Sequence, residues 1–522
     1  MSECPSSAAA ALAAPFATIP ELIALHALER PEGIALVHES RSIGYRELQA
    51  RIDRVAAALQ RDGVGPRDVV ALCSANSIDC AIVLFGALRA GAAVAPVPQS
   101  TAPGALAAMV ADSGASHLFV DAAVRAALLP HRSALPAHVV TLDESDDDAS
   151  LAGWLRDAPT PPTAVRIEPE WPFNVIYSSG TTGTPKGIVQ PHAMRWTHVQ
   201  RAAVYGYGPD AVTLISTPLH SNTTLVSFLP AIALGGTVVL MAKFDAERYL
   251  ALAERHRATH TMLVPVQYQR ILAHPAFNRH DLRSFRLKFS TSAPFPAEQK
   301  SQVLARWPGG LVEFYGMTEG GGTCVLACHE RPDKLHTAGR PAPGHDIRVI
   351  DEHGHELPLG EVGEVVGRSP AMMTGYHGRP DATAAAEWRD AEGRRYIRTG
   401  DLGRFDEDGF LVLLDRRKDM IISGGFNVYP SDLEAVLRTH PDVQDVAVVG
   451  VPSERWGETP VAFVVPPPGV RVDAAELRAW ANARVGKLQR LADLRVVDAL
   501  PRSHIGKVLK RELRAAYAST SP

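Results

Sequence analysis

Residues 177–187 read Tyr177-Ser178-Ser179-Gly180-Thr181-Thr182-Gly183-Thr184-Pro185-Lys186-Gly187, so hydroxyls, glycines and one lysine share a single loop. Glycine lets a backbone adopt positive φ and approach a ligand closely. Free N–H groups, Ser/Thr hydroxyls and the charge of Lys186 suit phosphate oxygens. An apolar run at 173–177 predicts a buried strand that leads into the loop. Because Pro185 precedes Lys186 and Gly187 follows it, the loop lacks the Gly-Lys-Ser/Thr of a P-loop NTPase. The stretch therefore predicts a different kind of phosphate-binding loop, although such loops are also common as plain connections.

Four further polar motifs follow in order along the chain. They are Tyr315-Gly316-Met317-Thr318-Glu319-Gly320, then Thr399-Gly400-Asp401, then the run 415–425 with its Arg416, and finally Gly506-Lys507. Together with the loop at 177–187, these motifs resemble the adenylate-forming superfamily of acyl-CoA synthetases, stand-alone adenylation domains and luciferases. The resemblance covers about residues 16–513. It implies an ATP-dependent, AMP-forming carboxylic acid–CoA ligase that uses ATP, Mg²⁺ and coenzyme A.

Length and charge limit the class of protein. A chain of 522 residues exceeds what one hydrophobic core usually serves, so two or three domains are expected. With 53 Lys and Arg against 57 Asp and Glu, the net charge of -4 gives no general attraction to nucleic acid or to anionic lipid. Any affinity for phosphate must therefore be local.

Cysteine usage and the N-terminal sequence predict a cytoplasmic enzyme. Five cysteines spread along the chain argue against a disulfide framework and for a reducing compartment. The Ala-rich run 8–14 lacks the basic region of a signal peptide, and no uncharged apolar stretch reaches the roughly 18 residues that span a bilayer. We expect small-molecule partners, no nucleic acid and no membrane, with a monomer or a homodimer both possible.

Short apolar runs alternate with helical stretches over much of the chain. The expected strands are 69–73, 93–97, 117–120, 139–142, 211–216, 237–241, 261–264 and 287–290. This alternation predicts an α/β fold with largely parallel sheets and a β-rich section from about 362. We expect a poorly ordered leader, then a large domain over 1–417 that carries the ATP and acyl sites. Residues 418–522 are predicted to form a small, mobile α+β domain, with a helix capped by Ser431.

Adenylation joins two anions, so its site must neutralise charge and align the attack. Donors to the β- and γ-phosphates are expected from the first loop, namely Ser178, Ser179, Thr181, Thr182, Thr184 and Lys186, and Gly180 and Gly183 are expected to bind ATP with them. The resemblance places Tyr315 against adenine, with Gly316 beside it in the ATP site. It also places the catalytic Thr318 on the α-phosphate and Glu319 on Mg²⁺, a metal that prefers one or two carboxylates plus phosphate oxygens. A solvated loop carboxylate is the alternative for Glu319.

The resemblance assigns the remaining polar motifs to ribose, catalysis and CoA. Asp401 is expected to accept the ribose hydroxyls, with Arg416 reaching the ribose or a phosphate; a surface ion pair is the alternative for Asp401. Lys507 is expected to bridge the carboxylate and the α-phosphate during adenylation. Lys418 falls at the position of the family's hinge between domains. CoA is expected near Gly424, Gly425 and Trp456, although the glycines also suit a hairpin turn and Trp456 also suits core packing.

Small residues dominate the predicted acyl site. His220 matches the family's acyl-site histidine, although an aromatic residue often found before it is missing. The predicted lining is His220, Thr224, Ser292, Ala293, Gly316, Met317, Gly320, Gly321 and Gly322. No acidic residue occurs in 217–224, so the buried ammonium of a free amino acid would lack a partner. Aromatic, cinnamate-like and aliphatic acids all remain open, because apolar pockets separate close homologues poorly.

Two other functions share this nucleotide chemistry. An acyl-AMP ligase would pass its acyl group to the phosphopantetheine of an acyl carrier protein instead of to CoA. A catalytically silent nucleotide-binding homologue would lack turnover altogether. The joint presence of Lys186, Glu319, Asp401 and Lys507 argues against the silent homologue.

Overall fold

The computed structural model describes residues 7–142, 149–178, 186–416, 419–423, 426–453, 456–486, 489–503 and 506–520. The chain divides into two compact units. The first comprises residues 1–335, 342–346 and 368–397, and the second comprises residues 336–341, 347–367 and 398–522.

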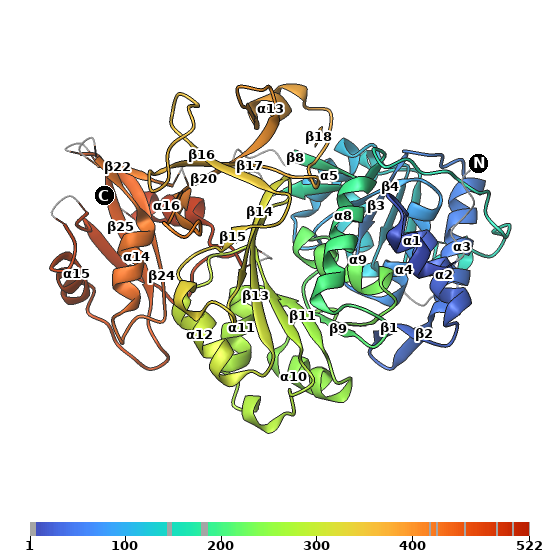
Figure 1. Cartoon of the computed structure of the whole chain (residues 1–522), viewed down its shortest axis with the longest axis horizontal. Coiled ribbons are helices and arrows are strands. Elements are labelled where there is room, and N and C mark those ends of the chain that lie inside the picture. Colours follow the sequence, from blue (N-terminus) through green and yellow to red (C-terminus); the bar gives the residue numbers. More distant parts are fainter. Residues whose placement is uncertain are drawn as a thin grey trace. The chain divides into compact units, whose positions relative to one another are not determined.

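One sheet of the first unit contains the two strands that precede and follow the predicted phosphate loop in the sequence (Figure 1). Its order is β18-β8-β7-β4-β3-β5-β6. The bounds are β3 Val69–Cys73, β4 Ala93–Pro96, β5 His117–Val120, β6 His138–Thr141, β7 Pro172–Ser178, β8 Lys186–Pro191 and β18 Gly375–Tyr376. Strands β7, β4, β3, β5 and β6 run parallel, whereas β7 and β8 form an antiparallel hairpin.

A second sheet of this unit has the order β14-β13-β12-β11-β9-β10-β1-β2. The bounds are β1 Ile34–His38, β2 Arg41–Gly44, β9 Val212–Ile215, β10 Thr237–Leu240, β11 His260–Leu263, β12 Leu287–Ser290, β13 Gly310–Met317 and β14 Gly320–Ala327. The strands from β1 to β13 in this order are parallel, whereas β2 is antiparallel to β1 and β14 is antiparallel to β13.

The first unit has one large core with residues of both sheets, and a separate apolar cluster on the first sheet. The helices are α1 Ala8–Ala13, α2 Ile19–Glu29, α3 Tyr45–Arg61, α4 Ile78–Arg89, α5 Pro103–Asp112, α6 Ala122–Leu128, α7 Leu151–Trp154, α8 His192–Ala202, α9 Asn222–Ala233, α10 Ala246–Arg255, α11 Pro265–Leu272, α12 Ala297–Arg306 and α13 Pro380–Ala385. In α3, Leu48, Ile52, Val55 and Leu59 are all fully buried, as helical spacing requires of one apolar face. They belong to a cluster that includes Leu72 of the first sheet and Val238 of the second. The predicted α/β fold is confirmed.

The N-terminal leader is more ordered than predicted. Residues 8–13 form α1, where the Ser7 hydroxyl accepts a hydrogen bond from the Ala10 N–H and Ala8 and Ala11 are buried. The expectation of a poorly ordered leader is wrong for these residues, because alanine is a strong helix former and its small side chain lets a helix pack closely.

Strand β20 (Arg395–Phe405) passes from the first unit into the second. In the first unit it pairs with β19 (Glu387–Arg389), and in the second with β21 (Leu411–Arg416) and β17 (Gly363–Arg368), beside which lies β16 (Asp346–Ile350). β15 is Arg340–Pro341.

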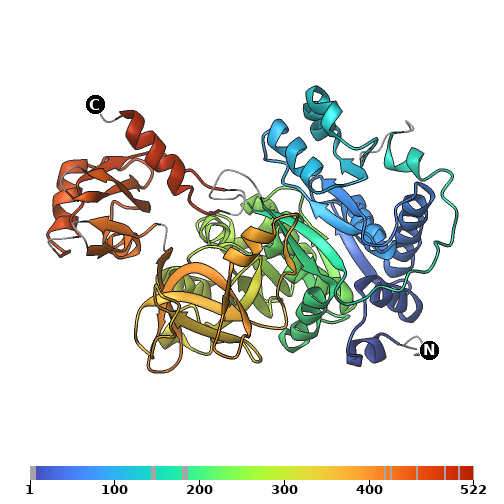
Figure 2. The ribbon, with the colours of Figure 1, turned by 90° about the horizontal axis from the view of Figure 1, so that it is seen from above.

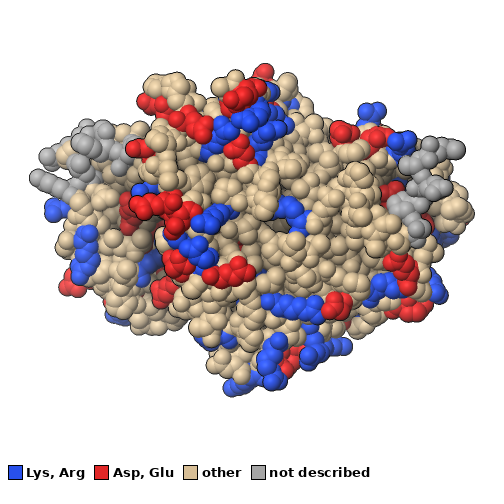
Figure 3. All heavy atoms as spheres, in the orientation of Figure 1, with Lys and Arg blue, Asp and Glu red and all other residues tan. Residues whose placement is uncertain are grey.

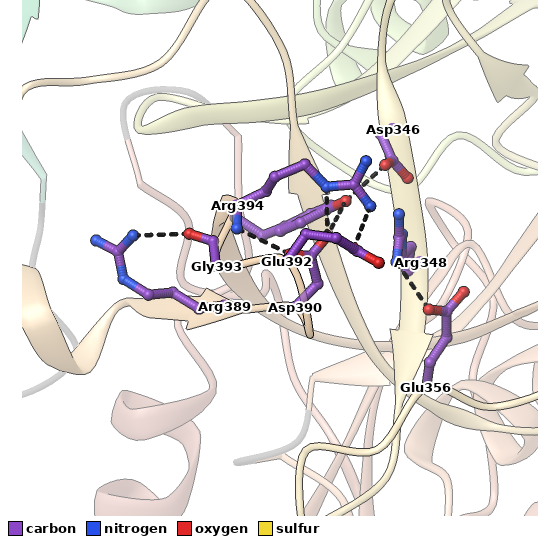
Figure 4. A network of polar contacts seen from close by, with 9 residues as sticks. Asp346, Arg348, Glu356, Arg389, Asp390, Glu392, Gly393 and Arg394 are labelled. Carbon is purple, nitrogen blue, oxygen red and sulfur yellow. Dashed lines mark hydrogen bonds and ion pairs between the residues drawn. The ribbon is translucent and has the colours of Figure 1, made fainter.

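Charged side chains anchor the start of β20 (Figure 4). Arg394 Nε donates to Asp390 Oδ2 at 2.6 Å, and the hydroxyl of the fully buried Tyr396 donates to Asp346 Oδ2 at 2.6 Å. Arg394 Nη2 also donates to Glu392. This network fixes the strand that leads to Thr399-Gly400-Asp401.

The C-terminal part of the chain forms a separate sheet. Its order is β23-β22-β25-β24, with β26 beside β25. The bounds are β22 Ile421–Ser423, β23 Phe426–Val428, β24 Asp445–Ser453, β25 Gly457–Val465, β26 Asp493–Val496, α14 Pro430–Arg438, α15 Ala474–Asn482 and α16 Lys510–Thr520. Along β24, Val446 and Val448 pack in the cluster of α14 and α15, whereas Ala447 and Val449 pack in the cluster of α16, the long red helix in Figure 2. Alternation of this kind covers both faces of the sheet and confirms the predicted small α+β domain.

The predicted Ser431 cap is wrong. Helix α14 begins at Pro430 and its N-cap is Tyr429, whose side chain makes no capping hydrogen bond; the Ser431 N–H donates instead to Asp415 Oδ2 at 2.9 Å. Proline is favoured at the first helical position because its missing N–H is not needed there, so Pro430 rather than Ser431 marks the start.

The surface bears charges of both signs. On the face drawn in Figure 3, Lys and Arg are interspersed with Asp and Glu, in line with the net charge of -4. Within the described part of the chain, no helix combines the length and the apolar character that crossing a bilayer demands.

Candidate active site

The predicted phosphate loop connects two paired strands. Ser178 of β7 lies opposite Lys186 of β8, so the strand register fixes where the loop starts and ends. Lys186 Nζ lies 5.1 Å from the centre of the Tyr376 ring, a cation–π contact. Some of the predicted loop residues lie outside the part of the chain that the structure describes: Ser179, Gly180, Thr181, Thr182, Gly183 and Thr184, together with the Ser178 side chain.

Thr318 and Glu319 form the turn between β13 and β14, where Met317 pairs with Gly320. Gly320 has φ +82°, and a Cβ there would lie 2.1 Å from the Ala371 carbonyl oxygen. The Met373 N–H donates to the Glu319 carbonyl at 2.8 Å. Only glycine therefore lets this turn lie against the segment 371–373.

Tyr376 contacts both Lys186 and Glu319. Its hydroxyl donates to Glu319 Oε1 at 2.9 Å, while its ring faces Lys186. It reaches this position because β18 pairs with β8, with Tyr376 opposite Ile188. Burial, and secondarily the charge of Glu319, raise the pKa of Tyr376 above its usual range, so the hydroxyl stays a donor. The sequence prediction missed this residue, because a two-residue strand gives no periodic signal.

The donor set at this turn suits magnesium. Mg²⁺ is a hard cation that is commonly bound by one or two carboxylates together with phosphate oxygens and water. Glu319 offers one carboxylate, and the hydrogen bond from Tyr376, whose ring faces Lys186, orients it. Metal-bound groups are usually oriented by such a partner.

The predicted acyl residues come from three elements of the first unit. His220 lies just before Ser221, the N-cap of α9. Thr224 is fully buried and its hydroxyl donates to the Pro218 carbonyl at 2.6 Å, so this side chain serves the loop itself. Ser292 has φ +80°, and its hydroxyl pairs with that of Thr223, which joins the loop containing Ala293 to α9.

The β13–β14 hairpin supplies the remaining predicted acyl residues. Tyr315 pairs with Cys324, and Gly316, Met317, Gly321 and Gly322 lie on the same hairpin. A Cβ at Gly316 would meet the Gly322 carbonyl oxygen at 3.4 Å, an ordinary contact.

In the second unit, Asp401 lies on strand β20 and Lys507 lies in a turn. Asp401 lies opposite Arg416 in the β20–β21 pair, after Gly400 with φ +70°, and its N–H donates to the Thr399 hydroxyl at 3.0 Å. Lys507 is exposed in a turn in which its carbonyl accepts from the Ser503 N–H at 2.8 Å.

The structure says less about the other residues predicted in this unit. Trp456 is 42% exposed, which argues against core packing. The predictions for Lys418, Gly424 and Gly425, and for the Arg416 side chain, lie outside the described residues. Lys510, the neighbour of Lys507, pairs with Glu434 at 3.0 Å.

Family comparison identifies the class of enzyme. Residues 23–377 match the family model described as AMP-binding enzyme, and residues 432–507 match that of the AMP-binding enzyme C-terminal domain. This chain belongs to the family of AMP-binding enzymes. The match confirms the predicted adenylate-forming superfamily. The predicted domain boundary at Lys418 lies between the two matched ranges and stays a prediction.

Relatives of this AMP-binding enzyme match over nearly their whole length. It is 36% identical over 492 residues to a feruloyl-CoA synthase of Amycolatopsis sp, which covers 93% of this chain and 96% of the relative. It is 33% identical over 512 residues to the fatty acid–[acyl-carrier-protein] ligase ScoC of Streptomyces coeruleorubidus, covering 96% of each. The ATP-bound structure of MatB from Rhodopseudomonas palustris is 28% identical, with a TM-score of 0.86 over 96% of this chain and 99% of that chain.

Proposed function

We propose that this enzyme is a carboxylic acid–CoA ligase. The acid oxygen attacks the α-phosphorus of ATP, the bond to pyrophosphate breaks, and an acyl-adenylate forms. The CoA sulfur then attacks the acyl carbon, its proton is lost, and AMP leaves as acyl-CoA forms. The observation that carries the proposal is the convergence of Lys186, Tyr376 and Glu319 beside the phosphate-loop hairpin. The family match supports the ATP-dependent, AMP-forming class.

Each predicted residue takes one role in this scheme. We propose that Lys186 neutralises the outer phosphates, that Thr318 binds the α-phosphate, and that Glu319 holds Mg²⁺, which screens the negative charge when it is bound. Asp401 holds the ribose in the same scheme. Lys507 stabilises the charge that develops as the acid attacks.

An aryl-substituted acid is the first substrate to test. The feruloyl-CoA synthase relative is named for an aromatic acid. At Gly316 of the β13–β14 hairpin a Cβ would make only ordinary contact, whereas at Gly320 it would lie 2.1 Å from the Ala371 carbonyl oxygen. A free amino acid is disfavoured by the lack of acidic residues in 217–224.

The acyl acceptor is the second open choice, because the two curated relatives differ in it. We propose CoA as acceptor and keep an acyl carrier protein as the competing candidate. Both present the same pantetheine arm, so only the surface that meets the rest of the acceptor separates them. A cytoplasmic location is proposed with it, since the described cysteines, Cys73, Cys80, Cys324 and Cys328, are free and buried.

The test is pyrophosphate–ATP exchange with a panel of benzoic, cinnamic, indole and aliphatic acids. Exchange with at least one acid supports the first step, and exchange at background with every acid overturns it. Mass spectrometry then follows the acyl group with CoA or with holo acyl carrier protein present. Acyl-CoA formation supports the CoA ligase, whereas acylation of the carrier protein alone assigns the other acceptor.

A further inference from the structure

Helix α8 carries a row of basic side chains inside the first unit. His192, Arg195, His198 and Arg201 follow one another at every third position, and the helix contains no acidic residue. Side chains three apart lie on the same face of a helix. Arg195 is only 1% exposed. Among the side chains that the structure describes, no carboxylate pairs with it.

The guanidinium of Arg195 is bound entirely by neutral amides. Its Nε and Nη2 donate to Asn174 Oδ1 at 3.0 and 2.9 Å, and its Nη1 donates to Asn222 Oδ1 at 2.9 Å. Its Nη2 also donates to Gln190 Oε1. The Phe173 ring lies 5.7 Å away. These groups replace the water that burial removes, but they leave the positive charge uncompensated.

The three amides lie on the elements that carry the predicted site. Asn174 belongs to β7 and Gln190 to β8, the two strands of the phosphate-loop hairpin. Asn222 begins α9, two residues after His220. Gln190 Nε2 in turn donates to the Thr318 carbonyl at 2.6 Å. The guanidinium is therefore two hydrogen bonds away from the turn that bears Thr318 and Glu319.

Burying a guanidinium without a counter-ion costs free energy, and three amides could be held together without that cost. Burial disfavours the charged form and lowers the pKa of Arg195 to about 9, so it is still charged at neutral pH. A neutral side chain, or an arginine paired with a carboxylate, would avoid leaving a bare charge in the interior. The cost is explained if the anions of the reaction supply the missing negative charge.

We infer that Arg195 is a positioning residue whose uncompensated charge favours the anionic reactants bound at the Thr318 turn. Arg195 orients the turn through Gln190, and its guanidinium keeps a positive charge in the interior near that turn. The inference rests on the proposed function, because it needs ATP to bind there. It adds a role for a residue that lies outside the phosphate loop and the Thr318 turn.

The test compares binding of Mg-ATP with binding of adenosine, which has no charge. Removing a unit charge that acts across roughly 10 Å of protein should weaken ATP binding about tenfold. Arg195→Gln should therefore raise the Kd for ATP about tenfold and leave the Kd for adenosine unchanged, whereas Arg195→Lys should keep most of the ATP affinity. Arg286→Gln is the matched control, since it removes a 45% exposed guanidinium that pairs with Asp210; it should change neither Kd.

A second variant covers the case in which Arg195→Gln does not fold. Asn222→Asp keeps an oxygen against Nη1 and neutralises the guanidinium in place, and at the first position of α9 an acidic residue also suits the helix N-terminus. It should retain thermal stability and lose ATP affinity selectively. Equal ATP affinity in these variants and the wild type, or a parallel loss of adenosine affinity, would overturn the inference. Failure of the wild-type chain to bind ATP would count against the proposed function itself.

Discussion

Tyr376 offers the sharpest test of the proposed Mg²⁺ site at Glu319. Tyr376→Phe removes one hydroxyl, and with it the 2.9 Å hydrogen bond to Glu319 Oε1, while the ring that faces Lys186 remains. A hydrogen bond to a charged group contributes about 1.5–3 kcal/mol. Loss of a partner that orients a metal ligand typically costs about 10–100-fold in metal affinity or activity. We therefore expect the Mg²⁺ concentration for half-maximal pyrophosphate–ATP exchange to rise at least about tenfold, with exchange restored at high Mg²⁺.

The control for this experiment is Tyr396→Phe. Tyr396 is a fully buried tyrosine that likewise donates to a carboxylate, at 2.6 Å to Asp346, but it anchors β20 rather than Glu319. Its removal should lower thermal stability and leave the Mg²⁺ dependence as in the wild type. If Tyr376→Phe gives the wild-type Mg²⁺ curve, Glu319 does not hold the metal in the way that we propose.

Three further changes test other parts of the site and the fold. Lys507→Ala should slow acyl-adenylate formation by about 10²–10³-fold and spare thioester formation from supplied acyl-adenylate, as rapid-quench assays of each half-reaction would show; equal losses would reject the assignment. Gly320→Ala should lower the melting temperature, because its Cβ would lie 2.1 Å from the Ala371 carbonyl oxygen, whereas Gly316→Ala, with its nearest contact at 3.4 Å, should keep stability and shift the acid panel toward smaller acids. His192 is 3% exposed, and burial lowers its pKa from 6.5 to about 3, so it contributes stability that is complete above pH 6.5 and is lost as the pH falls toward 3. From pH 7 to pH 5, the free energy of unfolding of the wild type should therefore fall by about 2 kcal/mol more than that of His192→Asn, as urea titrations at the two pH values would show. An equal fall in both proteins would contradict the assignment.

Most of the α/β part could be predicted because buried parallel strands appear as short continuous apolar runs. The runs 69–73 and 117–120 became β3 and β5 with the same bounds. Where local chemistry competes, the pattern was less informative. At the start of α14, both Pro430 and Ser431 suit a helix N-terminus, and proline marks the first helical residue. The run of alanines before residue 14 resembled a leader, because burial of Ala8 and Ala11 depends on tertiary packing.

The candidate site was predictable only where one motif holds its residues together. Lys186 and Glu319 each stand in a recognisable local pattern, and the structure brings both to the β7–β8 hairpin. Tyr376 follows Glu319 by 57 residues and reaches it through a strand of two residues. Arg195 and its amides are spread over β7, β8, α8 and α9. Contacts of this kind arise from strand pairing and helix packing, so neither composition nor spacing could indicate them.

The residues predicted around the phosphates and the residue predicted to assist the attack differ in how firmly the structure holds them. Register, a glycine turn and the hydroxyl of Tyr376 fix Lys186, Thr318 and Glu319. Lys507, in contrast, is exposed in a turn that follows Gly506, with φ +77°. In the proposed scheme nucleotide is bound through both half-reactions, so the groups that hold it gain from fixed positions. A cation that helps only while the acid attacks must not hold the α-phosphate once AMP has to leave, and an exposed turn suits such a residue. This difference is the physical reason to expect Lys507→Ala to affect the first half-reaction alone.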